Sequence, residues 1–406
     1  MTVRAADVVV TGLGATTPLG GDVASTWAGL LAGESGIGVI DEEWAGGLPV
    51  RIAARLRVEP TEVLDRVQAR RLDRCEQIAI VAAREAWADA GRPEVQPERL
   101  AVVIGTATGG ALSMLGQDDI LEASGVRRVS PHTIPMLMAN GPAAWVSIEL
   151  GARGGAHTPV SACASGAEAI AMGLDLIRLG RADVVVAGGT EACIHPLPLA
   201  GFAQARAHST RNDEPLRASR PFDTDREGFV IGEGAALVVL ERAGFAAARG
   251  ARVHAVLAGA GVSSDAHHIT AAQQEGQVRA IRLALASAGL DPHEIGHVHA
   301  HATSTQLGDL TEAGSIAEAV GTHPVVTATK SMTGHLFGAA GAIGAVAAIL
   351  ALRDQVVPAT VNLDRLDPEV KLDVVAGRSR PVALSAALTN SFGFGGHNAS
   401  LVFTTG

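Results

Sequence analysis

The sequence has no tyrosine, few aromatic residues of any kind and only three cysteines. Aromatic residues make up 3% of the 406 positions, which excludes the stacking platforms that bind single-stranded nucleic acids. Cys75, Cys163 and Cys193 are too few and too scattered for a disulfide framework or a zinc knuckle. This pattern predicts a cytoplasmic protein whose thiols are reduced.

Positive charge is also scarce, and lysine is almost missing. Lys and Arg together number 32 against 42 Asp and Glu, and the net charge of −10 disfavours nucleic acids and anionic membranes as partners. Lys330 and Lys371 are the only lysines, so the other thirty basic positions carry arginine. A lysine kept in such a chain indicates a place where a compact ammonium, or a proton that can leave, is needed. Lys371 lies in a charged segment and is interpreted as a surface residue.

Long hydrophobic runs are lacking as well. The longest uncharged run, residues 336–352, falls just short of a membrane span and consists mainly of Ala and Gly. We interpret it as a buried, closely packed helix, and we expect no membrane association. Residues 1–6 show neither the charged nor the apolar region of a signal peptide.

What the chain does contain is typical of a large α/β protein. Hydrophobic residues make up 47% and charged residues 18%, a composition that forms a core. Short β-branched runs alternate with segments of helical period, which predicts helices layered on buried sheets. The expected strands are 7–12, 100–105, 182–188, 235–240, 253–259, 297–301, 325–328 and 399–403, and the expected helices are 77–90, 167–179, 278–288 and 338–352.

Two stretches share one plan, which indicates an internal duplication. In residues 161–189 and again in 331–360, small residues lead into an Ala-rich helix and then a Val-rich strand. With a strand opening each half, we expect an N-terminal half over 1–250 and a C-terminal half over 251–406 that share one compact body.

Cys163 is the first candidate site residue. It lies in Val160-Ser-Ala-Cys-Ala-Ser-Gly166, just before the expected helix 167–179. Free N–H groups and the positive end of a helix dipole lower the pKa of a thiol, which predicts a nucleophilic cysteine. The alternative, a small buried apolar residue, suits Cys75 and Cys193 better.

His301 ends a run that begins at His297 and includes His299. Alternate residues of a strand face one side, so a metal site with a His-x-His pair is a rival interpretation. No cysteine or carboxylate follows at ligand spacing, which disfavours the metal.

Two further segments complete the candidate site. Lys330-Ser-Met-Thr-Gly-His335 precedes the Ala/Gly helix and holds one of the two lysines. The segment 390–398, Asn-Ser-Phe-Gly-Phe-Gly-Gly-His-Asn, is a glycine-rich loop before the last strand. Its pattern is not that of a dinucleotide loop, and we interpret it as a gate with exposed backbone N–H groups.

Together these segments resemble the β-ketoacyl-[acyl-carrier-protein] synthases of the elongating (type II) branch, in the thiolase-like superfamily. The resemblance covers nearly the whole chain. The two most specific motifs, which actinobacterial members share, are Thr158-Pro-Val-Ser-Ala-Cys-Ala-Ser-Gly-Ala-Glu and Ser391-Phe-Gly-Phe-Gly-Gly-His-Asn. The resemblance implies a thiolase-like fold of five α-β-α-β-α layers with an internal duplication, an acyl carrier protein as partner, and a dimer. It implies no metal and no cofactor beyond the phosphopantetheine of that carrier protein.

The resemblance also implies roles for individual residues. Cys163 carries the acyl chain, His301 and His335 bind the malonyl thioester, and Lys330 supports them. The backbone N–H groups of Cys163 and Phe394 form an oxyanion hole, while Phe392, Phe394 and Gly395 belong to the gate. Substrate-binding positions are Thr303, Thr305, Asp265, Thr270 and Thr108, and docking of the acidic carrier falls to Arg66, Arg70, Arg71, Arg74, Arg127, Arg128 and Arg206.

The chain also departs from the family pattern. Gly344 stands where relatives carry a glutamate that pairs with the lysine, so that Lys330 needs another partner such as Glu312. His299 replaces a frequent asparagine, and Thr108 replaces a bulky apolar residue at the floor of the acyl pocket. The missing glutamate keeps a second function open, the ketosynthase subunit of a type II polyketide synthase paired with a chain-length-factor paralogue. A non-catalytic partner subunit is disfavoured because Cys163, His301 and His335 are all present.

Overall fold

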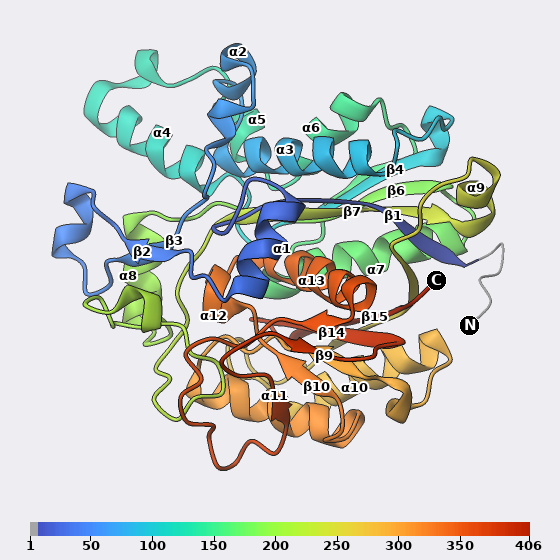
Figure 1. Cartoon of the computed structure of the whole chain (residues 1–406). Coiled ribbons are helices and arrows are strands. Elements are labelled where there is room, and N and C mark those ends of the chain that lie inside the picture. Colours follow the sequence, from blue (N-terminus) through green and yellow to red (C-terminus); the bar gives the residue numbers. More distant parts are fainter. Residues whose placement is uncertain (1–6) are drawn as a thin grey trace.

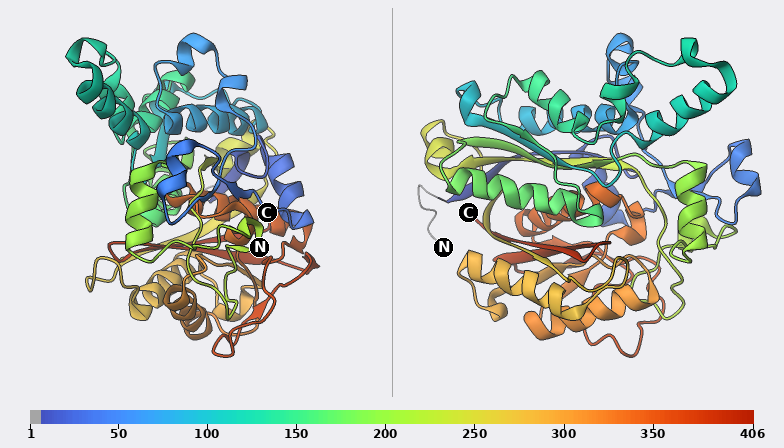
Figure 2. Two further views of the ribbon diagram at one scale, coloured as in Figure 1. Left: turned by 90° about the vertical axis from the view of Figure 1, so that its left-hand side faces the viewer. Right: turned by 180° about the vertical axis from the view of Figure 1, so that it is seen from behind.

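The computed structural model describes residues 7–406; the segment 1–6, for which no signal peptide is predicted, lies outside the described residues. Within that range, two stacked sheets alternate with three layers of helices, as Figure 1 and the rear view of Figure 2 show. The predicted five-layered α-β-α-β-α arrangement is therefore confirmed.

The strands of the N-terminal half form the upper sheet of Figure 1. Their spatial order is β1 (Val8–Thr16), β7 (Gly234–Arg242), β6 (Val184–Glu191), β4 (Leu100–Gly105) and β5 (Ala156–His157). The first two pairings in this order are antiparallel and the next two are parallel. All residues of β4, β6 and β1 are buried, as expected for strands that are covered on both faces.

The strands of the C-terminal half repeat this pattern. Their order is β8 (Ala255–Ser264), β15 (His397–Thr404), β14 (Ala386–Gly393), β9 (His297–His299) and β10 (Val325–Thr327), with β12 (Asp373–Val374) at the edge. Again two antiparallel pairings precede two parallel ones, and β12 adds a third parallel pairing. The same order and the same directions in both sheets are the structural form of an internal duplication. The sheets join where Val9 and Val10 of β1 pair with β8.

Six long helices complete the layers. The upper layer is α3 (Arg74–Asp89) and α6 (Gly141–Leu150), the middle layer α7 (Ser165–Arg178) and α13 (Ala340–Asp354), and the lower layer α10 (Gln274–Ala288) and α11 (Gln306–Ala319). The remaining helices are α1 (Val23–Ala32), α2 (Arg66–Ala69), α4 (Ala111–Ser124), α5 (Thr133–Leu137), α8 (Pro196–Gln204), α9 (Ala243–Ala248) and α12 (Lys330–Thr333). Four short strands form two separate two-stranded sheets: β2 (Ile37–Val39) pairs with β3 (Ile52–Ala54), and β11 (Val356–Val357) pairs with β13 (Arg380–Pro381).

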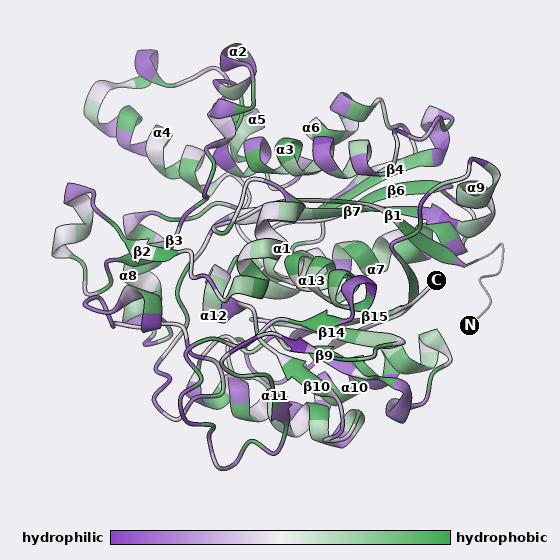
Figure 3. Cartoon of the chain, in the orientation of Figure 1, coloured by the Kyte–Doolittle hydropathy of each residue, from purple (hydrophilic) through white to green (hydrophobic). Residues whose placement is uncertain are grey.

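The middle layer explains the Ala- and Gly-rich run of the sequence. The apolar window Phe337–Asp354 has the length and composition of a membrane span, but 89% of it is buried inside the molecule. Figure 3 shows α13 and α7 as mainly hydrophobic helices between the two sheets. Small side chains let α13 pack against α7 on one side and β14 on the other, so the prediction of a buried helix is confirmed.

Three expectations about single elements need correction. The first four residues of the predicted loop 390–398 belong to β14, whose side chains are buried between the layers. The strand expected over 297–301 ends at His299. The Val-rich segment after α13 is the two-residue β11, outside the large sheets, and the strand that corresponds to β6 is β14, thirty residues further on. The division at residue 250, between α9 and β8, stays a prediction.

Glu76 is a buried carboxyl group whose protonation contributes to stability. Its Oε2 accepts a hydrogen bond of 2.8 Å from the N–H of Asp73, and its Oε1 has no partner. Burial, together with the charge of Asp73, raises the pKa of Glu76 to about 8. Because this pKa lies above the ordinary value of 4.5, the folded chain binds more protons than the unfolded chain, and stability is lost as pH rises towards 8.

We expect Glu76→Gln to remove this pH dependence. Between pH 6 and pH 9 the wild-type protein should lose on the order of 2 kcal/mol more free energy of unfolding than the variant. Denaturant titrations of both proteins at the two pH values measure the difference. Glu85 and Asp309, each with a pKa raised to about 7, contribute equally to both proteins, and parallel losses would contradict the assignment to Glu76.

Candidate active site

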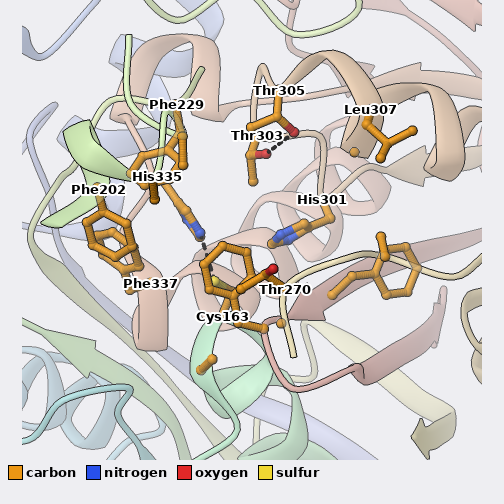
Figure 4. A pocket seen from close by; sticks show the side chains of 18 of the residues that line it. Cys163, Phe202, Phe229, Thr270, His301, Thr303, Thr305, Leu307, His335 and Phe337 are labelled. Atoms are coloured by element: carbon orange, nitrogen blue, oxygen red, sulfur yellow. Dashed lines mark hydrogen bonds between the residues drawn. The ribbon is translucent and has the colours of Figure 1, made fainter. Parts of the chain in front are cut away.

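A cavity of about 720 Å³ lies where the two halves meet, and three of the predicted site residues converge in it. Cys163 comes from the N-terminal half, and His301 and His335 come from the C-terminal half. The Cys163 sulfur and one ring nitrogen of each histidine all lie within 4.8 Å of one another. Figure 4 shows both imidazole rings turned towards the sulfur.

The turn that carries Cys163 is held by serine hydroxyls and by a close backbone contact. Cys163 lies in a 3₁₀ turn, Ala162–Ala164, directly before α7, and Ala162 has a φ of 52°. The Ser165 hydroxyl accepts a hydrogen bond of 2.9 Å from the N–H of Ser161 and contacts the carbonyl of Ala162. From β14, the Ser391 hydroxyl donates to the Cys163 carbonyl at 2.7 Å. Such an unusual φ persists only where its surroundings determine it, as these contacts do.

Gly393 of β14 has no space for a side chain beside this turn. A Cβ atom there would lie 2.5 Å from the carbonyl oxygen of Ser161 and 3.1 Å from the nitrogen of Cys163. The glycine therefore lets the last hairpin approach the nucleophile turn at backbone distance. The sequence predicted that Cys163 lies at the N-terminal end of a helix, but it did not identify Ser165, Ser391 or Gly393 as residues that hold the turn.

The Cys163 thiol is protonated in the resting site. Burial raises its pKa to about 12, against the opposing effects of the Lys330 charge and the N–H of Phe394. The predicted lowering of this pKa by the helix end is therefore wrong for the resting site, because desolvation of the thiolate outweighs the favourable charges. Sγ lies 3.0 Å from Nε2 of His335, so thiol and imidazole form a neutral hydrogen-bonded pair.

His335 is held by aromatic side chains and by the backbone. Its N–H donates to the carbonyl of Val230 at 2.7 Å, and its ring stacks on Phe337 with centroids 4.6 Å apart. Phe229 meets the same ring edge-on at 5.6 Å. Burial, reinforced by the charge of Lys330, lowers the pKa of His335 well below its ordinary value, so the ring stays neutral.

Two oppositely charged side chains hold the backbone of His301 in place. Its N–H donates to Glu312 at 2.7 Å, and the next N–H, of Ala302, donates to the same carboxyl group at 2.6 Å. The Lys330 ammonium donates to the carbonyl of His301. Burial and the charge of Lys330 lower the pKa of His301 well below its ordinary value. The ring is therefore a neutral hydrogen-bonding group in a fixed position.

Lys330 is the buried positive charge of the site. Burial lowers its pKa to about 8, while Glu312, Cys163 and Asp309 oppose that change. Glu312 thus acts on Lys330 through space, but across residues 7–406 no carboxylate comes within the 4.0 Å of an ion pair with it. Lys371, by contrast, is exposed and donates only to the carbonyl of Pro368, as expected of a surface lysine.

The three histidines of the 297–301 run do not share a site. His297 hydrogen-bonds the carbonyl of Val325 at 2.9 Å, and His299 hydrogen-bonds the Thr329 hydroxyl at 2.8 Å. His301 joins His335 and Cys163 instead. The rival interpretation of a metal bound by the run itself is therefore wrong.

The two phenylalanines of the expected gate differ in exposure. Phe392 is buried, with its ring centroid 6.0 Å from that of His301, whereas Phe394 is 42% exposed. The turn 394–396 contacts the loop 265–270 through hydrogen bonds from Gly395 N to Ile269 O, 2.6 Å, and from Asp265 N to Gly396 O, 2.9 Å. The structure thus brings the two segments together at the cavity.

The other predicted substrate positions also line this cavity. Thr303 and Thr305 hydrogen-bond each other at 3.1 Å, and Thr270 faces them across the opening in Figure 4. Thr108 donates at 2.6 Å to Glu191, a fully buried carboxyl group that also accepts the N–H groups of Ala107 and Gly338. Glu191 was not found from the sequence, although its place at the end of a buried strand is a usable signal.

Aromatic residues are concentrated at this site. Five of the eight phenylalanines line the cavity, namely Phe202, Phe229, Phe337, Phe392 and Phe394. Phe202 stacks on Phe337 at 5.3 Å and meets Phe229 edge-on at 5.1 Å, so three rings form one wall (Figure 4). In a chain so poor in aromatic residues, this clustering indicates an apolar ligand. Sequence reasoning used only the last two of these phenylalanines.

The predicted docking arginines lie in four places. Arg66, Arg70 and Arg71 are exposed in and after α2, and Arg127 and Arg128 are exposed after α4. Arg206 is exposed and lines the cavity. Arg74 differs, because it opens α3 and its guanidinium is bound by Glu59 and Glu233 at 2.7 Å each. Arg74 therefore belongs to an internal ion-pair network and lies on a different helix from Arg66.

Both parts of the chain match family models. The model described as "Beta-ketoacyl synthase, N-terminal domain" matches residues 5–246, and "Beta-ketoacyl synthase, C-terminal domain" matches residues 254–364. The 3-oxoacyl-[acyl-carrier-protein] synthase 2 of Mycobacterium tuberculosis is 48% identical over 402 residues, 98% of this chain and 96% of that protein. The enzyme of the same name from Synechocystis sp. is 45% identical over 404 residues, 98% and 97% of the two chains.

Solved structures agree with these matches. The ishigamide ketosynthase/chain length factor has a TM-score of 0.93 at 35% identity, covering 98% of this chain and 99% of the other. A β-ketoacyl synthase from Burkholderia phymatum has a TM-score of 0.92 at 35% identity, with the same coverage. A ketosynthase complex with a type II polyketide acyl carrier protein has a TM-score of 0.90 at 29% identity, also with 98% and 99% coverage.

We expect Lys330→Met to slow alkylation of Cys163 by iodoacetamide at pH 7 by roughly tenfold, since a nearby positive charge favours the reactive thiolate. The difference should shrink above pH 8, where the wild-type lysine loses its proton. Rates are measured by intact mass between pH 6 and pH 10, with Cys163→Ala as the control for labelling elsewhere. Equal rates at pH 7 would show that the lysine charge does not act on the sulfur.

Proposed function

The chain belongs to the β-ketoacyl synthase family, and on this basis we propose that it is a 3-oxoacyl-[acyl-carrier-protein] synthase. The reaction is the decarboxylative Claisen condensation of a malonyl unit with an acyl chain held on Cys163. The observation that carries the proposal is the convergence of the Cys163 sulfur and the two neutral imidazoles within 4.8 Å of one another. The substrates arrive on the phosphopantetheine of a carrier protein, with no other cofactor and no metal, in the cytoplasm.

The first step transfers the acyl chain to the cysteine. The Cys163 sulfur bonds to the carbonyl carbon of the acyl thioester, the pantetheine sulfur leaves, and the thiol proton ends on the departing pantetheine. His335, 3.0 Å from the sulfur, is placed to accept that proton on the way. The N–H groups of Cys163 and Phe394 stabilise the tetrahedral oxyanion, in keeping with their favourable effect on the charged sulfur.

The second step breaks a carbon–carbon bond of the malonyl group. Carbon dioxide leaves, and the electron pair moves to form an enolate whose charge lies on the thioester oxygen. His301 and His335 donate hydrogen bonds to that oxygen. Neutral rings suit this task, because they stabilise the oxygen without protonating the carbanion too early.

In the third step the enolate carbon attacks the carbonyl carbon of the acyl-cysteine. The sulfur leaves and takes up one proton, which restores the thiol and releases the 3-oxoacyl product. The aromatic wall formed by Phe202, Phe229 and Phe337 receives the apolar chain, and Thr108, which is exposed in the single chain, lines the same cavity. Thr303 and Thr305 bind the pantetheine arm near the opening.

The carrier protein and a second subunit are the proposed partners. Arg206 at the cavity, with Arg127, Arg128, Arg66, Arg70 and Arg71, offers exposed positive charge to an acidic carrier. Figure 1 shows α2, α4 and α8, which carry or precede these arginines, in the left half of the view. The region from α4 to β5 exposes Met114, Val126, Ile134 and Ile148 and ends in an edge strand, which suits a dimer.

A second candidate function is the ketosynthase subunit of a type II polyketide synthase. The resemblance to the ishigamide ketosynthase/chain length factor and the absence of a carboxylate at Gly344 favour it. The chemistry at Cys163 is the same in both settings. The second subunit distinguishes them: two identical chains indicate fatty-acid-type elongation, and a co-purifying paralogue of similar mass indicates the polyketide setting.

Incubation with an acyl-carrier protein should increase the mass of the protein by one acyl group. We expect this adduct in the wild type and in His301→Ala, and none in Cys163→Ala. Malonyl-carrier protein should then discharge the wild-type adduct and release a 3-oxoacyl product, at least about 100-fold faster than in His301→Ala. Intact-mass analysis over time follows both steps. Formation of 3-oxo products by Cys163→Ala at the wild-type rate would contradict the proposal.

Charge reversal at the opening should act on recognition rather than on chemistry. We expect Arg206→Glu to raise KM for the carrier protein about tenfold at low salt, with kcat little changed, and the effect to fade as salt rises. Arg282→Glu is the matched control, since Arg282 is exposed on α10 and does not line the cavity. An unchanged KM for Arg206→Glu would exclude this residue from docking.

A further inference from the structure

Gly344 of α13 faces two polar side chains of the lower sheet. A Cβ atom at this position would lie 2.8 Å from Oγ1 of Thr389 and 2.9 Å from Nδ1 of His299, closer than side-chain carbons approach such atoms. Thr389 of β14 and His299 of β9 are paired across parallel neighbouring strands, so both project from the same face. Neither atom has a hydrogen-bond partner. The His299 ring therefore packs directly against the Cα atom of Gly344.

The other side of the same ring is tied to α12. Nε2 of His299 lies 2.8 Å from the Thr329 hydroxyl, and both residues are buried. Thr329 is the capping residue of α12, and Lys330 is the first residue of that helix. His299 thus spans the distance between the middle helix α13 and the first turn of α12 with one rigid side chain.

Lys330 depends on this first turn for its position. Its ammonium donates to the carbonyl of His301, and among the described residues it has no carboxylate within ion-pair distance. The titratable groups that face it are Glu312 and Asp309 from α11, Cys163, and the three histidines His299, His301 and His335. A lysine without an ion-pair partner is held by its backbone and one hydrogen bond, so a shift of Thr329 moves the ammonium directly.

We propose that His299 is a positioning residue for Lys330, and that it performs this task only because Gly344 leaves room for its ring. The contact of α13 with His299 thereby fixes Thr329, and through Thr329 it fixes the position of the ammonium that binds the His301 carbonyl. The inference rests on the proposed function only where it assigns His301 to the malonyl unit. The contacts themselves and the reactivity of Cys163 are independent of that assignment.

The test is a double-mutant cycle with Gly344→Ala, His299→Asn and the two combined. In Gly344→Ala the new methyl group displaces the ring. In His299→Asn the shorter side chain leaves space for that methyl group but loses the contact with Thr329. We expect each single variant to lower kcat about tenfold with KM little changed, and the double variant to be no worse than His299→Asn alone, because the methyl group then meets only the Thr389 hydroxyl and no longer a side chain that contacts Thr329.

The second readout is the pH profile of Cys163 alkylation by iodoacetamide, which reports the charge beside the sulfur whether or not condensation occurs. We expect the part of this pH profile that follows the titration of Lys330 to shift along the pH axis in both single variants. Ala351→Val is the matched control: it overfills the same face of α13 two turns further on, where it should lower the Tm and leave the alkylation profile as in the wild type.

Two results would overturn the proposal: a Gly344→Ala variant that changes only the Tm, and effects of the two substitutions that simply add. A shifted alkylation profile in variants of a protein that condenses no substrate would support the positioning role while rejecting the proposed function.

Discussion

Burial and a single positive charge together set the protonation of the site. The Lys330 ammonium lies among Cys163, His301 and His335 in a space that water scarcely reaches, where charges act strongly over several ångströms. It lowers the pKa of both imidazoles and opposes the rise in the pKa of the thiol. Burial keeps the thiol neutral against this charge, and burial and the charge together keep the rings neutral, so the ammonium remains as the positive charge for the anions that the reaction creates.

The fold brings these groups together from distant parts of the chain. Cys163 precedes a middle-layer helix of the first half, and His335 lies just before its counterpart in the second half. Because α7 and α13 pack against each other through Ala and Gly, their first turns lie side by side. Internal duplication thus supplies two equivalent helix starts, one used for the nucleophile and one for a hydrogen-bonding ring.

Much of this arrangement can be predicted from the sequence, and the exceptions have physical reasons. The alternation of helices with buried sheets and the buried α13 follow from periodicity, whereas the five layers and the convergence of Cys163, His301 and His335 follow from the resemblance to a known family. The protonation state of Cys163 does not, because burial is a property of the folded cavity and outweighs the local helix end. The ion pairs of Arg74 depend on Glu59 and Glu233, the second of which is 159 residues away. β14 was missed because a strand covered on both faces can carry serine, threonine and asparagine when neighbouring strands and helices satisfy them.

The bond from Ser391 to the carbonyl of Cys163 has a consequence for how the protein is made. The nucleophile turn leaves the ribosome more than 200 residues before the hairpin of β14 and β15, which supplies Ser391, Gly393 and the N–H of Phe394. Until that hairpin docks, the turn is held by Ser165, and the Cys163 carbonyl lacks its donor. Before this hairpin is added, the cysteine lacks the N–H of Phe394, and the complete site forms only once the hairpin has docked.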